Sequence, residues 1–185
     1  VLQQIKHGTL QVLAQIKAVG HTFPAINEAT LRQYTHLGDG ASKTDNRIYS
    51  EKLGPNEVDG NYSGRPDDRW AFTTKSADLQ YGSVATLAAA ASALRGYDDA
   101  LAKECLDTAI RIWNEEHANP TPARGGPGGP GAGAVSADEW NAAIQLVIAT
   151  SGGEPYKKRL LEMFPTMMQR FGFGGWSAVH VLSYL

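Results

Sequence analysis

The 185-residue sequence lacks the features that define several protein classes. A single cysteine, Cys105, excludes an internal disulfide framework and any zinc site built from several cysteines. The formal charge of −2 leaves no basic excess to neutralise a phosphate backbone, so we expect no nucleic-acid partner. No run approaches the roughly 18 apolar residues of a membrane span, so we expect no membrane insertion. The five histidines show no metal-binding spacing.

What the sequence does contain is enough apolar material for one sizeable core, since 42% of its residues are hydrophobic. Val1 begins inside an amphipathic pattern, and the chain stops at Leu185 within an apolar run, without a cap at either end. There is neither an initiator Met nor a signal peptide at Val1. We therefore expect a segment of a longer domain.

Helical periodicity covers most of the chain, and strand signals are almost absent. Start and stop signals, chiefly Gly, Pro and capping residues, set the expected limits. The predicted helices are Leu2–Val19, Asn27–Tyr34, Leu79–Leu94, Asp98–His117 with Asp98 as cap, Ser136–Thr150, Pro155–Phe171 with a kink or a break at Pro165, and a last helix from Trp176. These elements predict an all-α fold of antiparallel helical hairpins.

Two segments break the helical pattern. Residues 36–74 contain five glycines and two prolines and read as a long irregular loop, which in a compact domain is usually functional. Residues 119–133 form a Gly/Pro-rich loop that lacks the phosphate-loop pattern, so we expect a solvent-exposed insertion. The first segment is the main candidate for ligand contact.

The end of the long loop leads directly into an alanine-rich helix. Pro66 and the aspartates after it favour a turn, which leaves Arg69 and Trp70 at the mouth of the helix Leu79–Leu94. The small side chains of that helix allow close approach, as expected of an inner helix surrounded by others. This arrangement suggests a recognition loop on a helical scaffold.

Three stretches together carry a family resemblance. These are Arg-Pro-Asp-Asp-Arg-Trp-x-Phe-Thr-Thr at 65–74, Cys-Leu-x-x-Ala-x-x-x-Trp at 105–113, and Asp-Glu-x-x-Ala-Ala-x-x-Leu-x-x-Ala-Thr-x-Gly at 138–152. The Gly-Asp turn at 36–40 adds to them. The pattern resembles the middle of glycoside hydrolase family 9, the endoglucanase-type cellulases, and the third stretch is its most specific part.

The resemblance implies that residues 1–185 are part of an (α/α)6 barrel, with about half of its six inner and six outer helices present. It also implies inverting hydrolysis of β-1,4-glucan such as cellulose, in a secreted or periplasmic enzyme that requires no cofactor. Family members use an aspartate pair near the domain's start and a glutamate near its end, and neither motif is found in this chain. We therefore expect no catalytic residue here and no activity of the segment alone.

Four residues are candidate sugar contacts. Arg69 and Trp70 are the first two, because an indole face stacks on a pyranose ring and a guanidinium donates to hydroxyls. The alternative for Arg69 is a structural pair with an aspartate of its own loop. Tyr49 lies where many family members carry an Asp-His pair followed by a Trp, and Trp176 follows a glycine-rich stretch. By contrast, Trp113 and Trp140 lie on helical stripes, and we expect both in the core.

Asp138 and Glu139 match positions that bind a structural calcium in some family members, and carboxylate oxygens suit that ion. A capping box, Ser136-x-x-Glu139, explains Glu139 without a metal. The family's third carboxylate falls on Phe173 or Gly174, which cannot supply one. The acidic pair Glu115-Glu116 at a helix end is expected on a solvated face.

Two hypotheses for function follow. The first is a glycoside hydrolase segment that forms cleft wall and scaffold, and the alternative is a non-enzymatic helical toroid or repeat protein that binds a partner or an oligosaccharide. In either case half a barrel should leave open apolar surface. We expect it on the Leu87–Leu94 helix, on the Leu2/Ile5/Val12 stripe and at Val179/Leu182/Leu185, covered by the rest of the barrel or by self-association.

Overall fold

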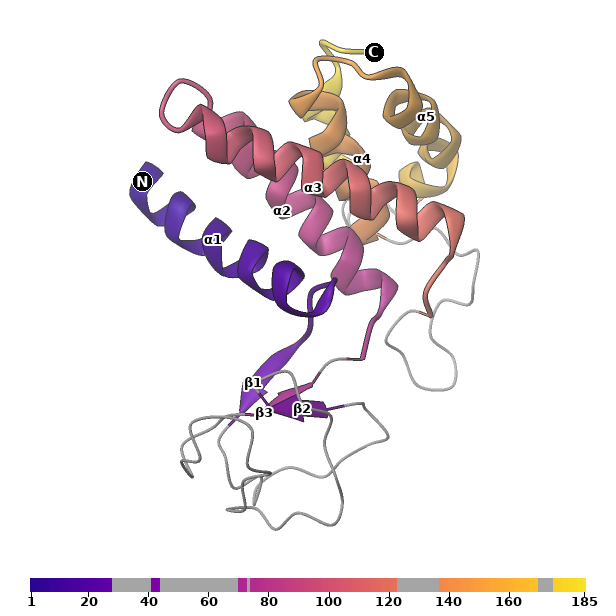
Figure 1. The fold of residues 1–185 in the computed structure, drawn as a ribbon. Coiled ribbons are helices and arrows are strands. Elements are labelled where there is room, and N and C mark those ends of the chain that lie inside the picture. Colours follow the sequence, from indigo (N-terminus) through magenta and orange to yellow (C-terminus); the bar gives the residue numbers. More distant parts are fainter. Residues whose placement is uncertain (28–40, 44–69, 73, 123–136, 170–174) are drawn as a thin grey trace. The chain divides into compact units, whose positions relative to one another are not determined.

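The computed structural model describes residues 1–27, 41–43, 70–72, 74–122, 137–169 and 175–185. Within these ranges the chain is mainly helical (Figure 1). The elements are α1 (Leu2–Val19), β1 (Ala25–Asn27), β2 (Ala41–Lys43), β3 (Trp70–Phe72), α2 (Ala77–Leu94), α3 (Asp99–Ala118), α4 (Ala137–Ala149), α5 (Glu154–Met168) and the 3-10 helix η2 (Gly175–Val181). The predicted all-α class is confirmed, with one small sheet in addition.

The chain divides into two compact units. One comprises Val1–Ala14 and Ser76–Leu185, and the other comprises Gln15–Lys75. Helix α1 has the predicted limits, begins in the first unit and ends in the second at Gly20, whose φ of +86° suits a residue without a Cβ. Within the first unit, Lys6 of α1 forms an ion pair with Asp98, with 2.8 Å between Nζ and Oδ2.

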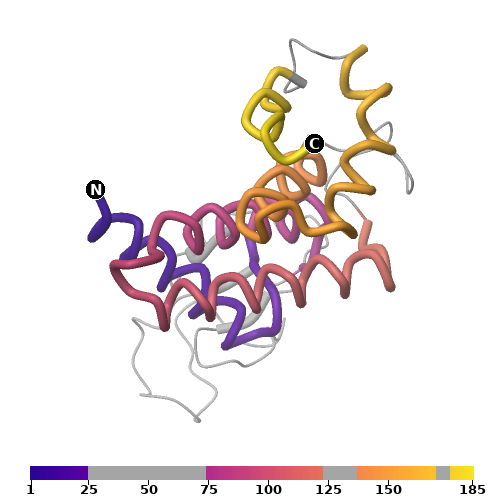
Figure 2. Tube along the Cα trace, turned by 90° about the horizontal axis from the view of Figure 1, so that it is seen from above, coloured from indigo at the N-terminus to yellow at the C-terminus, as the bar shows by residue number. Residues whose placement is uncertain are grey.

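Helix α2 is the central element of the first unit and packs against both α3 and α4. Helices α2 and α3 run side by side in two perpendicular views (Figures 1 and 2). The alanines of α2 permit this packing because they hold the helix without filling the space between its neighbours. The prediction of an inner helix is therefore confirmed within this unit.

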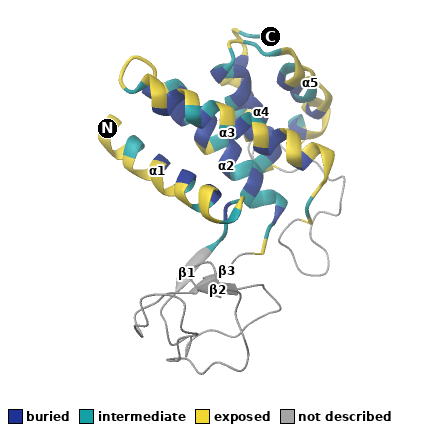
Figure 3. Ribbon diagram, in the orientation of Figure 1, coloured by how far each residue is buried: buried dark blue, intermediate teal, exposed yellow. Residues whose placement is uncertain are grey.

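The apolar side chains of α2 are covered rather than open (Figure 3). Leu87 and Leu94 are fully buried, so the predicted open surface on this helix is wrong. The reason is that α2 packs closely against both α3 and α4. The prediction is confirmed at the other end of the chain, where Val179, Leu182 and Leu185 of the η2 region are exposed.

Helix α3 begins as predicted, because the Asp98 carboxylate accepts a hydrogen bond from the Leu101 amide at 3.1 Å. Gly96, with φ of +77°, makes the tight turn from α2 into this cap. Trp113 of α3 and Trp140 of α4 are both buried, as expected. The Trp140 indole Nε1 donates to Ser177 Oγ at 3.0 Å, which ties α4 to η2.

The C-terminal helices differ in detail from the prediction. Helix α5 runs through Pro165 as one element to Met168, so the predicted break is wrong, and Phe171 lies outside the described residues. Pro165 lies in the last turn of α5 and has no amide hydrogen to donate to the carbonyl oxygen of Leu161 four residues earlier, so the helix continues with one backbone hydrogen bond fewer. The last helix is a 3-10 helix from Gly175, one residue before the predicted start at Trp176.

The second unit contains a three-stranded antiparallel sheet in the order β1-β3-β2. In this sheet Trp70 is paired with Asn27 on one side and with Lys43 on the other. Asn27 ends a strand instead of opening a helix, and the remainder of the predicted helix Asn27–Tyr34 lies outside the described residues. Three-residue strands are too short to show an alternating pattern, so the sequence did not reveal them.

Candidate functional site

A buried carboxylate stands at the start of α4. Glu139 lies in the first turn of the helix, where the unpaired backbone amides favour negative charge, and 6% of the residue is exposed. It is surrounded by apolar residues of the same helix, since Trp140, Ala142 and Ala143 are buried with it. A carboxylate in such a position requires positively charged or hydrogen-bonding partners.

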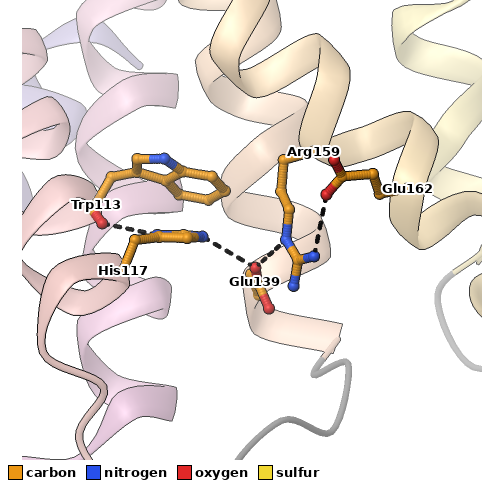
Figure 4. Close-up of polar contacts among 5 residues, drawn as sticks. All are labelled: Trp113, His117, Glu139, Arg159 and Glu162. Atoms are coloured by element: carbon orange, nitrogen blue, oxygen red, sulfur yellow. Dashed lines mark hydrogen bonds and ion pairs between the residues drawn. The ribbon is translucent and has the colours of Figure 1, made fainter.

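Two helices supply those partners (Figure 4). Arg159 of α5 donates from Nε to Glu139 Oε1 at 2.7 Å. His117 of α3 places Nε2 at 3.2 Å from the same oxygen. Arg159 also pairs through Nη1 with Glu162 of α5 at 3.3 Å. The four residues, which we call the Glu139 cluster, join α3, α4 and α5.

The hydrogen bonds of His117 identify its protonation state. Its Nδ1 lies 2.8 Å from the Trp113 carbonyl oxygen, and its Nε2 faces the Glu139 carboxylate. Both neighbours are acceptors, so both ring nitrogens must carry a proton to satisfy them. The geometry therefore belongs to an imidazolium ion.

The pKa shifts within the Glu139 cluster agree with these contacts. Burial raises the pKa of Glu139, but the hydrogen bonds and charges of His117 and Arg159 outweigh it and bring the pKa below its ordinary value. The hydrogen bond to Glu139 raises the pKa of His117, against a smaller effect of burial. Both shifts favour the charged forms, the carboxylate of Glu139 and the imidazolium of His117.

An aromatic group lies beside this cluster. The His117 ring is tilted by 33° over the Trp113 indole, with centroids 4.2 Å apart. Tyr81 of α2 meets both rings edge-on, at 5.8 Å from Trp113 and 5.7 Å from His117. Burial, followed by the charges of Glu139 and Glu116, raises the pKa of the Tyr81 hydroxyl. Tyr81 is therefore a neutral hydroxyl beside the imidazolium.

A second buried carboxylate lies one residue before His117. Glu116 is 1% exposed and accepts hydrogen bonds from the Thr121 amide at 3.2 Å and the Thr121 hydroxyl at 2.9 Å. The expectation of a solvated face is thus wrong for Glu116, because the chain after α3 turns back and supplies donors. It is right for Glu115, which is exposed and pairs with Arg111 at 2.7 Å.

Asp138, next to Glu139, is half-buried in the first turn of α4. Burial raises its pKa, and the negative charge of Asp78 on α2 adds to the effect. Asp138 therefore holds a proton more readily than an ordinary aspartate, in contrast to Glu139 one position later.

The structure describes the four predicted sugar contacts to different extents. Tyr49 and Arg69 lie outside the described residues, and for Trp70 only the strand backbone is described. Trp176 opens η2 with 53% of the residue exposed, and its ring meets the His180 ring edge-on at 6.0 Å. Trp176 is therefore the one candidate whose side chain is described, and its indole is accessible.

Comparison with models of protein families identifies the family of this chain. The model of glycosyl hydrolase family 9 matches residues 13–184 of the chain. The chain belongs to glycosyl hydrolase family 9. Neither a search of curated proteins nor a search of solved structures found a match. Membership in family 9 identifies the helices as part of an (α/α)6 barrel and the protein as a glycoside hydrolase by family.

In the described parts of the chain, none of the helices combines the length and apolar character that a membrane span requires.

The calcium expected from family 9 does not fit this donor set. Arg159 and His117 already contact Glu139 Oε1, and burial together with the negative charge of Asp78 raises the pKa of Asp138, which disfavours its charged form. At an effective dielectric constant of about 20, unit charges about 4 Å apart interact by about 4 kcal/mol, and a divalent ion beside Arg159 would be repelled by twice that. Among the described residues, no group of three or more His, Cys, Asp or Glu side chains is arranged to hold a metal.

Sequence reasoning missed Tyr81, His117 and Arg159. One usable signal was present, since Trp113 and His117 are one helical turn apart and must share a face of α3. Another was the position of Glu139 at the start of a helix composed mainly of apolar residues, where a buried carboxylate would require a cation. Neither signal identifies which residues pair with Glu139, because His117 is 22 residues away in the sequence and Arg159 is 20 residues away.

Proposed function

We propose that this chain is part of a glycoside hydrolase that cleaves β-1,4-glucan chains such as cellulose by inversion. The observation that carries the proposal is the match to glycosyl hydrolase family 9 over residues 13–184. Inversion requires a general acid and a general base about 6.5–9.5 Å apart with a water molecule between them, and no cofactor. We assign both carboxyl groups to the parent domain beyond this segment, as an aspartate pair upstream and a glutamate downstream.

The segment itself would then provide cleft wall and scaffold. The exposed Trp176 indole supports this role, because an apolar ring face with a polar edge suits the face of a pyranose ring. Arg69, Trp70 and Tyr49 are proposed as further sugar contacts. A polysaccharide substrate cannot enter a cell, so we propose a secreted or periplasmic location for the parent enzyme.

The test of sugar contact uses the 185-residue chain and cellohexaose. Trp176→Ala should weaken binding about 3- to 10-fold, as expected for loss of one stacking contact. Tyr97→Ala is the matched control, because Tyr97 is also about half exposed but lies in the turn between α2 and α3. Equal effects of the two changes, or no binding by the unaltered chain, would contradict a role for Trp176.

The test of the reaction uses the parent gene and its product. Sequencing on both sides of this segment should reveal the aspartate pair and the glutamate. The intact enzyme should release the α-anomer from a β-1,4-glucan, as seen by proton NMR of fresh product. Release of the β-anomer would rule out inversion, and absence of the carboxylates from a complete gene would favour the non-enzymatic alternative.

The exposed apolar end of the segment also calls for a partner. Val179, Leu182 and Leu185 are all exposed in and after η2. We propose that the rest of the barrel covers this surface in the parent, and that the isolated 185-residue chain self-associates through it. Sedimentation should therefore show concentration-dependent association that Leu182→Lys reduces, whereas a monodisperse monomer would contradict self-association.

A further inference from the structure

The Glu139 cluster joins three helices through one oxygen atom. Arg159 Nε and His117 Nε2 both approach Glu139 Oε1, at 2.7 Å and 3.2 Å. The carboxylate lies on α4, the guanidinium on α5 and the imidazole on α3. A metal ion performs the same structural task when it binds side chains from several helices, since it draws negative oxygen atoms to one point.

The charges of the cluster are balanced without a metal. Glu139 and Glu162 bring two carboxylates, and Arg159 and the imidazolium of His117 bring two cations. The Glu139 side chain is 7% exposed, compared with 34% for Arg159 and 33% for His117, so the two cations also shield it from solvent. An additional divalent ion at Oε1 would have to displace at least one of these cations from that oxygen.

We propose that Arg159 and His117 hold the Glu139 carboxylate in place of a structural calcium ion, so that α3, α4 and α5 are joined by an internal, metal-independent charge cluster. Two residues of α2 lie near the cluster, since Tyr81 contacts the His117 ring and the charge of Asp78 acts on Asp138. Asp138 does not restore a metal site, because it adds only one carboxylate, and among the described residues no group of three or more His, Cys, Asp or Glu side chains is arranged to hold a metal.

The first arm of the test measures the metal directly. The melting temperature of the unaltered 185-residue chain should differ by less than about 1 °C between EGTA and about 10 mM CaCl2 at matched ionic strength. A site with a dissociation constant near 0.1 mM would instead raise it by about 5 °C or more. A calcium-specific rise of more than about 2 °C would overturn the proposal.

The second arm removes the guanidinium. Arg159→Met should lower the melting temperature by about 5 °C, because Glu139 is left buried with one cation fewer. Arg111→Met is the matched control, since Arg111 also binds a carboxylate at 2.7 Å but in an exposed pair on α3. That control should lose less than about 1 °C. Equal losses in the two variants would overturn the proposal.

A double-mutant cycle assigns the loss to the pair. In a Glu139→Gln background, Arg159→Met should cost less than half of what it costs alone, because no buried charge remains to be compensated. An unchanged cost would show that Arg159 stabilises α5 by packing alone and would overturn the proposal. If Arg159→Met does not fold, Arg159→Lys, which keeps the charge but loses the planar fork, replaces it in the cycle with a smaller expected loss.

Discussion

His117 lies over Trp113, one turn earlier on α3, with ring centroids 4.2 Å apart and its Nδ1 bonded to the Trp113 carbonyl oxygen at 2.8 Å. The same turn of helix therefore offers the imidazole both a backbone acceptor and an aromatic face. A protonated ring gains from each, since the indole face attracts cations. Glu139 completes the arrangement from α4.

This arrangement predicts that stability falls at high pH. The pKa of His117 is raised in the folded state, chiefly by Glu139, so its contribution is complete below the ordinary pKa of 6.5. It is lost as the pH rises through the higher folded pKa. We expect a loss of roughly 1 kcal/mol for one charge-assisted hydrogen bond on a partly exposed ring. Denaturant unfolding between pH 6 and pH 9 measures it.

His117→Gln is the control for this titration, because glutamine donates a hydrogen bond but does not change charge in this range. The variant should be less stable than the original chain at pH 6 and should show a flatter profile at higher pH. A profile as steep as that of the unaltered chain would assign the pH dependence to another group.

For Asp138 we expect the charged form to destabilise the fold, because burial and the negative charge of Asp78 raise the pKa of this acid in the folded state. An acid with a raised folded pKa destabilises the fold once it ionises, so Asp138→Asn should stabilise the chain at pH 7 by up to about 1 kcal/mol. The gain should shrink as the pH falls through the raised folded pKa and vanish below the ordinary pKa of 3.8, where Asp138 is neutral in both the folded and the unfolded chain. Urea unfolding at pH 7 and pH 3.5 tests it, and destabilisation at pH 7 would indicate that the carboxylate is needed.

The sequence revealed local features of this fold better than contacts between distant elements. The limits of α1 and the Asp98 cap of α3 follow from residues next to one another, and both are correct. The partners of Glu139 come from α3 and α5, and only the packed structure brings them together. Glu116 shows the same limit, because acids at helix ends are usually solvated and the Thr121 donors lie beyond the helix.

Cys105 should be inert in the folded chain. Its side chain is fully buried on α3, and burial raises the pKa of the thiol to about 11, so almost none of the reactive thiolate is present at pH 7. Iodoacetamide should therefore modify the native chain at less than about a hundredth of the rate found in denaturant. Rapid modification under native conditions would show that α3 separates readily from α2.

The close packing of α2 gives the last prediction. Ala88 is fully buried, and α2 contacts both α3 and α4, so a larger side chain at this position must displace a neighbour. Ala88→Leu should destabilise the chain by about 1–3 kcal/mol. Ala93→Leu is the matched control, because it makes the same change at an exposed position of the same helix and should alter stability by less than about 0.5 kcal/mol. Chemical denaturation measures the free energy of unfolding of both variants. Equal stability of the two would contradict the close packing of α2 against α3 and α4.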